Sequence, residues 1–400
     1  MKSVVDVLHR AFVLLLLTSC ASAATLHVGP GQEYATPCRA ILAAAAGDTI
    51  QIEASGNYRG DVCKWVTNDL TIVGVNGRPK IDAAGRSAED KAIWVIAGDN
   101  TTVENIEFTG AVVPNHNGAA IRQEGANLTL RHCYIHGNEE GILAGNSPAS
   151  QILIETTEFA ENGYSNGESH NIYINHIAQF TLRFSYSHDA IEGHLVKSRA
   201  AQNFILYNRL TGEAGTSSLQ LDLPNGGRSY VIGNVLEKGP NSDNPNVVAF
   251  AEEGAANPNS ELYFVNNTVV NHSRRNGIFI TVGDGAAPAL VQNNIFSGAG
   301  LLTDQREARR SHNMMSGGLF VDAANYDFHL QSDSPARNFG VDPGTANGYS
   351  LTPVYQYVHP TCFEKRRTTG STIDAGAFAI RGAGGPDPSC ADSTAASKKP

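Results

Sequence analysis

The segment from His188 to Arg199 concentrates side chains that can do chemistry. Its 12 residues, HDAIEGHLVKSR, include two histidines, one aspartate, one glutamate, one lysine and one arginine. Removal of a proton next to a carboxylate needs a base and a cation that neutralises the carboxylate, and lysine, arginine and histidine are the usual candidates. The segment is therefore a candidate catalytic face, and the alternative is an ordinary solvated edge.

A repeated pattern of short β-rich segments predicts the elements that position these residues. One slot with a small or polar residue recurs at steps of 23 to 33 residues, about one solenoid coil with three short strands. Amides stacked at such a slot can hydrogen-bond along the solenoid axis. A cysteine in the slot is expected to be a small buried residue rather than a reactive thiol. The slot holds Cys133, Thr157, Ser185, Asn208, Asn234, Asn267 and Asn294.

The two ends of the chain differ from the repeats. Residues 1–23 read as a signal peptide, with an apolar run at 11–17 and a small-residue cleavage site, so we expect a periplasmic or secreted protein. Cys20 ends a lipobox-like LTSC, which leaves a lipoprotein open. Residues 24–340 are predicted to form the solenoid with an N-terminal cap that includes a short helix at 37–47. Residues 341–381 are predicted as a C-terminal cap region and 382–400 as a disordered tail.

Composition and charge restrict the classes of binding partner that we expect for this chain. The formal net charge of −10 argues against nucleic acid, and no stretch after the signal peptide is apolar enough to predict a transmembrane segment. Export permits disulfides, and the N-terminal pair Cys38 and Cys63 and the C-terminal pair Cys362 and Cys390 allow two bridges, with the connectivity open. A solenoid with covered ends is expected to be a monomer.

Several segments carry a family resemblance. The helix at 37–47, the run AGDTIQIEASGNY, the strands DLTIVG and TTVENIEF and the asparagine column resemble the right-handed parallel β-helices of the pectate-lyase-like superfamily. The resemblance covers about residues 25–300 and implies an all-β, right-handed parallel β-helix. The superfamily includes polysaccharide lyases, glycoside hydrolases, uronate epimerases and phage tailspikes, so the fold does not fix the activity.

Strand alternation predicts which side chains point outward from the solenoid. With Ile172 and Ile174, Val196 and Ser198, and Leu219 and Leu221 pointing inward, two outward rows result. We expect Lys197 as the base and Arg199 as the neutralising cation, with His194 and Asp222 also catalytic. The first row contains Tyr173, Lys197 and Gln220, and the second contains Asn175, Arg199 and Asp222. The expected substrate-binding residues are Tyr173, Asn175 and Gln220 from these rows, together with His170, His188 and Arg228.

A local motif adds a metal hypothesis. Glu192 followed by Lys197-Ser198 resembles the Lys-Ser motif of alginate lyases and chondroitinase B type lyases. The resemblance implies that Lys197 is the base and that Glu192, with Asn166 and Glu168 one coil earlier, binds Ca²⁺. That family carries an arginine one coil after the lysine, where this chain has Asp222, so Arg199 or Arg228 would have to substitute. No cofactor is otherwise required.

The function that fits best is a polysaccharide lyase acting on an anionic, uronate-containing glycan. A uronate epimerase shares the first step. A glycoside hydrolase would need two carboxylates, such as Asp222 with Glu192 or Asp189. A non-catalytic polysaccharide-binding protein is the third alternative. The adjacent acids Glu139-Glu140 and Glu252-Glu253 are interpreted as solvated pairs.

Overall fold

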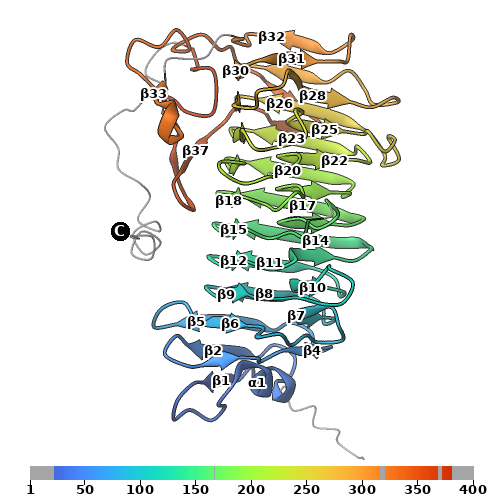
Figure 1. Cartoon of the computed structure of the whole chain (residues 1–400), viewed down its shortest axis with the longest axis vertical. Coiled ribbons are helices and arrows are strands. Elements are labelled where there is room, and N and C mark those ends of the chain that lie inside the picture. Colours follow the sequence, from blue (N-terminus) through green and yellow to red (C-terminus); the bar gives the residue numbers. More distant parts are fainter. Residues whose placement is uncertain (1–21, 166, 316–319, 368–371, 381–400) are drawn as a thin grey trace, which may run out of the picture.

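The chain folds into a long parallel β-solenoid (Figure 1). The computed structural model describes residues 22–165, 167–315, 320–367 and 372–380. Three parallel sheets of 12, 10 and 10 strands, here sheets 1, 2 and 3, run along the axis. The predicted all-β parallel solenoid is therefore confirmed. Most of the predicted signal peptide with Cys20, the residue Asn166, and the tail with Cys390 lie outside the described residues.

The strands of each sheet follow one another coil by coil. Sheet 1 contains β1 Thr25–Val28, β2 Thr49–Glu53, β5 Thr71–Val75, β8 Thr101–Glu104, β11 Leu128–Arg131, β14 Ser147–Glu155, β17 Ile177–Arg183, β20 Gln202–Leu206, β23 Arg228–Ile232, β26 Glu261–Val265, β29 Leu290–Gln292 and β32 Arg309–Ser311. Sheet 2 contains β4 Cys63–Trp65, β7 Ala92–Ile96, β10 Ala119–Gln123, β13 Glu140–Ala144, β16 Ile172–Ile174, β19 Lys197–Ser198, β22 Leu221–Leu223, β25 Val248–Phe250, β28 Gly277–Val282 and β31 Gly300–Thr303. Sheet 3 contains β3 Tyr58–Arg59, β6 Lys80–Asp82, β9 Glu107–Thr109, β12 Tyr134–His136, β15 Glu158–Ala160, β18 Tyr186–His188, β21 Arg209–Thr211, β24 Val235–Lys238, β27 Thr268–Asn271 and β30 Ile295–Gly298.

The interior is one continuous apolar core. Alternate residues of each strand point inward, and isoleucine, leucine, valine and phenylalanine side chains from successive coils stack on one another. Burial of this surface is the main stabilising contribution, because a coil cannot bury its inner face without its neighbours. The other residues of each strand emerge on the outer faces.

A ladder of polar side chains fixes one bend of every coil. Asn234 Oδ1 accepts the backbone N–H of Asn208 at 2.9 Å, and Asn267 Oδ1 does the same for Asn234. The residue before each slot has a positive φ, for example 54° at Asn266, and this left-handed turn exposes the N–H that the next coil satisfies. The predicted column is confirmed, and it continues to Asn313. Cys133 is buried in it, and burial raises the pKa of its thiol to about 11.

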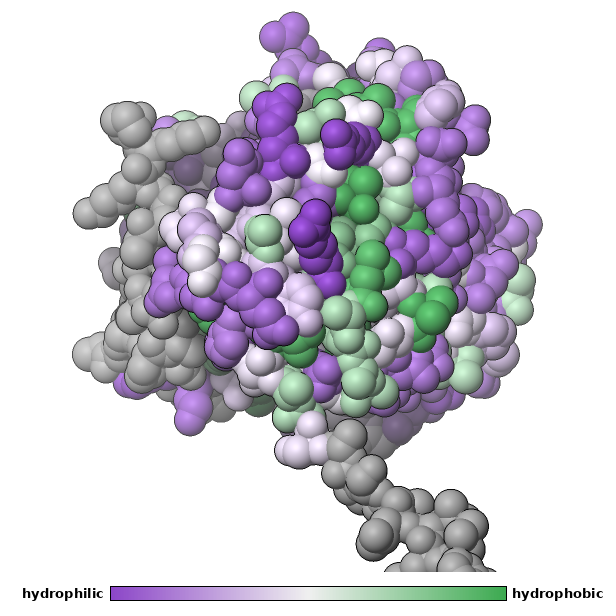
Figure 2. All heavy atoms as spheres, turned by 90° about the horizontal axis from the view of Figure 1, so that it is seen from below, coloured by the Kyte–Doolittle hydropathy of each residue, from purple (hydrophilic) through white to green (hydrophobic). Residues whose placement is uncertain are grey.

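The N-terminal end carries the helix α1, Pro37–Ala43, which is shorter than expected and packs against β1, β2 and β4. Cys38 and Cys63, whose pairing the sequence left open, form a disulfide that ties α1 to β4. Figure 2 looks at this end and shows apolar residues in green among polar ones. In α1, Leu42 is 63% exposed. In the described residues, no helix is both long and apolar enough to cross a membrane.

The C-terminal segment runs along the flank of the solenoid (Figure 1). Its described residues pack on the outer faces of sheets 1 and 3: Tyr355 and Phe363 surround Phe184, and Phe328 and Tyr357 cover Val235. The region that we expected as a C-terminal cap thus lies beside the coils, and the contacts of its described residues are with sheets 1 and 3 rather than with the outer face of sheet 2. The segment contains β33 Phe320–Asp322, η1 Ala323–Asn325, β34 Asp327–Leu330, β35 Thr345–Ala346, β36 Tyr349–Ser350, β37 Tyr355–Val358 and β38 Cys362–Lys365.

Candidate functional site

The outer face of sheet 2 brings the predicted catalytic residues together. Tyr173 on β16 pairs with Lys197 on β19, and Lys197 pairs with Asp222 on β22. We call the outward positions in this register the Lys197 row. It runs through Arg122, Leu143, Tyr173, Lys197 and Asp222.

The predicted register is wrong by two residues at the third strand. Leu221 and Leu223 point inward, so Asp222 stands beside Lys197, and Gln220 precedes the strand and is fully buried. The alternating run LQLDL satisfies the inward–outward pattern in either register, which is why the sequence pattern did not distinguish them. Gln220 therefore cannot lie on the outer face as a substrate-binding residue.

Two cations of this face share one carboxylate. Arg199 Nη1 lies 2.7 Å from Glu253 Oε2, and Lys197 Nζ lies 3.5 Å from Glu253 Oε1. The Arg199 Nε also donates to the Tyr173 hydroxyl at 3.1 Å. The side chains of Lys197 and Arg199 are only 14% and 15% exposed, whereas that of Glu253 is 48% exposed. Glu253, read from the sequence as solvated, thus covers a pair of half-buried cations.

A second carboxylate lies beneath the same ammonium group. Asp222 Oδ2 is 3.4 Å from Lys197 Nζ. Burial raises the pKa of Asp222 to about 6, and the charge of Lys197 opposes this effect. The hydrogen bond from Arg199, by contrast, lowers the pKa of Glu253. The two carboxylates next to Lys197 therefore differ in pKa, with that of Asp222 raised and that of Glu253 lowered.

His170 and His194 form a neutral stack behind this face. Their rings lie 4.7 Å apart, and burial lowers the pKa of His194 to about 3 and that of His170 well below its usual value. The Nδ1 of His170 accepts the backbone N–H of His194, and the Nδ1 of His194 accepts that of Leu219. Each ring therefore carries its proton on Nε2. The Nε2 atom of His194 lies 3.4 Å from Asp222 Oδ2. The two histidines position the site and orient Asp222.

Glu139 and Glu140 are buried, so their interpretation as a solvated pair is wrong. Glu139 Oε2 accepts backbone N–H groups from Val113 and Gly118, at 2.9 and 2.8 Å. Glu140 accepts the backbone N–H of His170 at 2.9 Å, and burial raises its pKa well above the usual value. The two carboxyls hold the turns that lead into sheet 2, a role that adjacent charges in a sequence do not reveal.

Other predicted site residues lie elsewhere. Arg228 begins β23 in sheet 1 and pairs with Glu261 at 3.2 Å, so it is on a different face from Lys197. Asn175 accepts the backbone N–H of His176 within its own turn. Glu168 and Glu192 are exposed, and among the described residues no group of candidate metal ligands contains either of them. The Ca²⁺ site that the family resemblance implied therefore stays a prediction, and its third residue, Asn166, lies outside the described residues.

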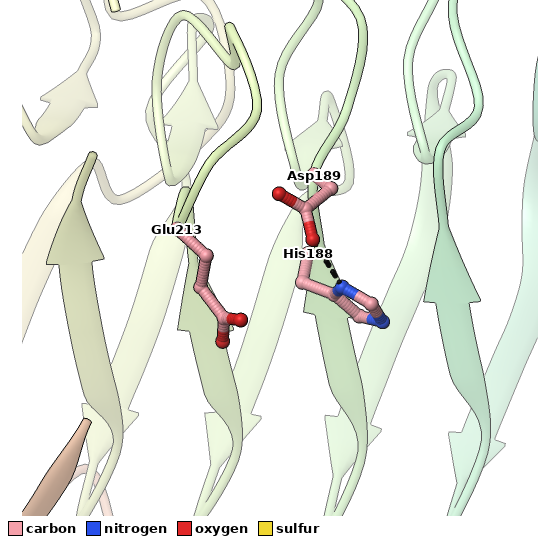
Figure 3. A group of neighbouring side chains, drawn as sticks. All are labelled: His188, Asp189 and Glu213. Atoms are coloured by element: carbon pink, nitrogen blue, oxygen red, sulfur yellow. Dashed lines mark hydrogen bonds and ion pairs between the residues drawn. The ribbon is translucent and has the colours of Figure 1, made fainter. Parts of the chain in front are cut away.

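His188 belongs to a second charged cluster, on sheet 3 (Figure 3). Ligand atoms of His188, Asp189 and Glu213 lie within 4.8 Å of one another, a grouping that could hold a metal ion. However, Glu213 accepts hydrogen bonds from Arg209 and Thr211, both at 2.7 Å. A cation there would compete with a buried guanidinium. This cluster is complete as a network of paired side chains.

The charge state of His188 also distinguishes this cluster from the Lys197 row. Burial alone would lower the pKa of His188, but hydrogen bonds to Asp189 and Glu158 raise it to about 9. The imidazole is therefore a buried cation in an ion-paired network. Tyr326 and His359 of the C-terminal segment pack over Arg209 and Tyr186. This placement separates His188 from the substrate-binding set in which it was expected.

A surface cavity of about 570 Å³ lies on the outer face of sheet 1. Its lining consists of threonine, asparagine, glutamine and aliphatic residues, including Thr102, Thr129 and Gln151. The residues that line it include no titratable side chain, so the cavity offers binding surface rather than a base or an acid. The outer face of sheet 2 remains the candidate active site.

Comparisons with known proteins agree with the architecture. No protein-family model matches the chain, and no curated protein matches it. Among solved structures, the crystal structure of pectate lyase Pel9A matches with a TM-score of 0.54 and 13% sequence identity, over 90% of this chain and 97% of that chain. At this identity the likeness concerns the fold. The chain thus has the fold of a pectate-lyase-like parallel β-helix.

Proposed function

We propose that this chain is a polysaccharide lyase that cleaves a uronate-containing glycan by β-elimination on the outer face of sheet 2. The observation that carries the proposal is the carboxylate of Glu253, bound by Lys197 and Arg199 together. A pair of cations spaced for one carboxylate, and covered by an exposed side chain that can leave, suits the carboxylate of a uronate. Arg199 then neutralises the charge that develops in the enolate.

The remaining groups can complete an elimination. Lys197, in its amine form, takes the proton from the carbon next to the uronate carboxylate. Electrons of that C–H bond form the new double bond, and the bond to the glycosidic oxygen breaks. Asp222 supplies the proton to the departing oxygen, a role that suits a carboxyl whose pKa burial raises to about 6. His194 holds Asp222 in place through its Nε2–H.

Calcium has no step in this mechanism, because the guanidinium of Arg199 already faces the substrate carboxylate. We also propose that the protein is exported, as residues 1–23 suggest. The disulfide between Cys38 and Cys63 supports an oxidising compartment.

The first test is incubation with a panel of uronate polymers. A lyase produces an unsaturated uronate, which absorbs ultraviolet light, together with new reducing ends. We expect both, and we expect them to persist in the presence of a chelator. Reducing ends without new absorbance would point to hydrolysis, and altered uronate stereochemistry without chain cleavage would point to epimerisation. Glycan retention without any product would reduce the proposal to a binding function.

A glycoside hydrolase is the second candidate, because Asp222 and Glu253 form a new carboxylate pair. Both lie within 3.5 Å of the Lys197 nitrogen, so their nearest oxygens are less than about 7 Å apart, a separation that glycosidases use. The raised pKa of Asp222 and the lowered pKa of Glu253 also suit an acid and a base. The variant Glu253→Gln separates the two functions, because it removes a hydrolase's carboxylate but spares a lyase.

A further inference from the structure

Arg122 is a cation in the Lys197 row, away from the catalytic residues. It lies on β10, and the register from β10 through β13 and β16 to β19 aligns it with Leu143, Tyr173 and Lys197. Three strand spacings separate it from Lys197, about 14 Å along the solenoid axis. Sequence patterns did not single it out, because one arginine in AAIRQ looks like an ordinary surface residue.

The surroundings of Arg122 provide no carboxylate partner among the described residues. Its Nε is buried without a hydrogen-bond partner, and its row neighbours Val95 and Leu143 are apolar. Glu124 directly follows the strand but binds Lys64 and Lys91, at 3.3 and 2.6 Å. A half-buried guanidinium with an unsatisfied donor is unfavourable unless a ligand completes it.

Glu140, whose carboxyl lies within electrostatic range, does not neutralise Arg122 either. Burial raises the pKa of Glu140 well above its usual value, and Arg122 and Lys197 both act on that carboxyl. The face between the two cations is therefore short of negative charge. Leu143 and Tyr173 lie between them and offer an apolar and aromatic floor of the kind that packs against sugar rings.

We propose that Arg122 forms a second carboxylate-binding subsite, which holds a uronate about three sugars away from the cleavage point. The inference rests on the proposed function and names its substrate as a polyuronate lying along the solenoid axis. A pyranose is about as long as one strand spacing, so a chain of roughly four sugars reaches from Lys197 to Arg122.

The experiment measures kcat and KM for oligouronates sorted by length. In the wild type, KM should fall once the chain reaches about four sugars. Arg122→Gln should raise KM about tenfold for these longer chains, as expected for the loss of one charge-assisted contact, and leave kcat and the shorter chains unchanged. Arg122→Lys should give an intermediate KM, because it keeps the charge and loses the forked geometry. Lys64→Gln is the matched control, since Lys64 lies in the same row but is already paired with Glu89 and Glu124.

A rise in KM that is the same at every length, or no rise, would overturn the subsite. A second readout, retardation of the protein in gels that contain polyuronate, does not need turnover. If the wild type cleaves no polymer, the proposed function fails, but loss of retardation in Arg122→Gln would still support the subsite. Equal retardation of Arg122→Gln and wild type, or none for the wild type, would refute it. Melting temperatures of all variants verify that they are folded.

Discussion

Sheets 2 and 3 each carry a cluster of histidine, acidic and basic side chains, and the two clusters differ in how they are satisfied. On sheet 3, the cation of His188 and the cation of Arg209 each face carboxylates, and the C-terminal segment packs over them. On sheet 2, His170 and His194 are neutral, Asp222 has a raised pKa, and the cations of Lys197 and Arg199 hold an exposed carboxylate. Similar residue types thus give a closed structural network on one face and an open, imperfectly matched site on the other.

The largest loss of activity is expected for the variant Lys197→Met on sheet 2. Loss of the base should lower kcat by roughly 10²–10⁴-fold or more, because proton abstraction then has no catalyst. The melting temperature should change much less than kcat, because methionine keeps the packing of the largely buried lysine stem. Steady-state assays and thermal melts test this expectation, with Lys64→Met as the control. Full activity in a folded Lys197→Met protein would remove this residue from the mechanism.

Arg209→Met should show the opposite pattern. It leaves the half-buried carboxylate of Glu213 without its cation and removes the guanidinium from the faces of Tyr186 and Tyr326. We expect a loss of about 3–5 kcal/mol in the free energy of unfolding, and unchanged activity per folded molecule. Denaturant titration measures the first quantity. The double variant with Glu213→Gln should recover part of the loss, and strict additivity would contradict the pairing.

His188 predicts a pH dependence of stability. Its folded pKa of about 9 lies above the ordinary value near 6.5, so it contributes stability that is fully present below about pH 6.5 and is lost as pH rises through about 9. His188→Gln should therefore cost on the order of 2–3 kcal/mol at pH 6 and much less at pH 10. His136→Gln, in the same row of sheet 3 but with a single carboxylate partner, is the control. Equal costs at both pH values would contradict a charged His188.

The smallest change is expected for Glu253→Gln. A lyase substrate must displace this carboxylate from Lys197 and Arg199, so the neutral amide should lower KM for a uronate polymer a few-fold with kcat retained. Kinetics at two ionic strengths should show the effect shrinking in high salt. An inactive Glu253→Gln protein would instead favour hydrolysis with Glu253 as a catalytic carboxylate.

Sequence reasoning predicted the fold well because the fold depends on repetition. The slot from Cys133 to Asn294 identifies the coils directly, and the pairing of Cys38 with Cys63 is consistent with the export that was expected. The site was recovered in part. The segment with Lys197 and Arg199 was found from its density of charged side chains, and Tyr173 from strand alternation.

The errors share a physical cause, which is that turns between strands vary in length. A two-residue shift before β22 moved Gln220 into the interior and Asp222 beside Lys197, while both registers kept alternation. Arg228 lies outside the site because it begins β23 in sheet 1, whereas sequence reasoning placed it in the turn after Asp222. Glu253 and Arg122 lie 56 and 75 residues from Lys197 in the sequence and meet its row only through coil stacking.

The C-terminal segment should slow the local opening of the coils that it contacts. Residues such as Tyr355 and Tyr357 lie against coils that also carry Lys197 and Asp222, whereas the coils near the N-terminus have contacts mainly with their immediate neighbours. Local opening should therefore be slowest in the middle of the solenoid and faster toward β1, a gradient that amide hydrogen exchange would display. The C-terminal segment thus braces the outer faces of sheets 1 and 3 in the same coils that hold Lys197 and Asp222 on sheet 2.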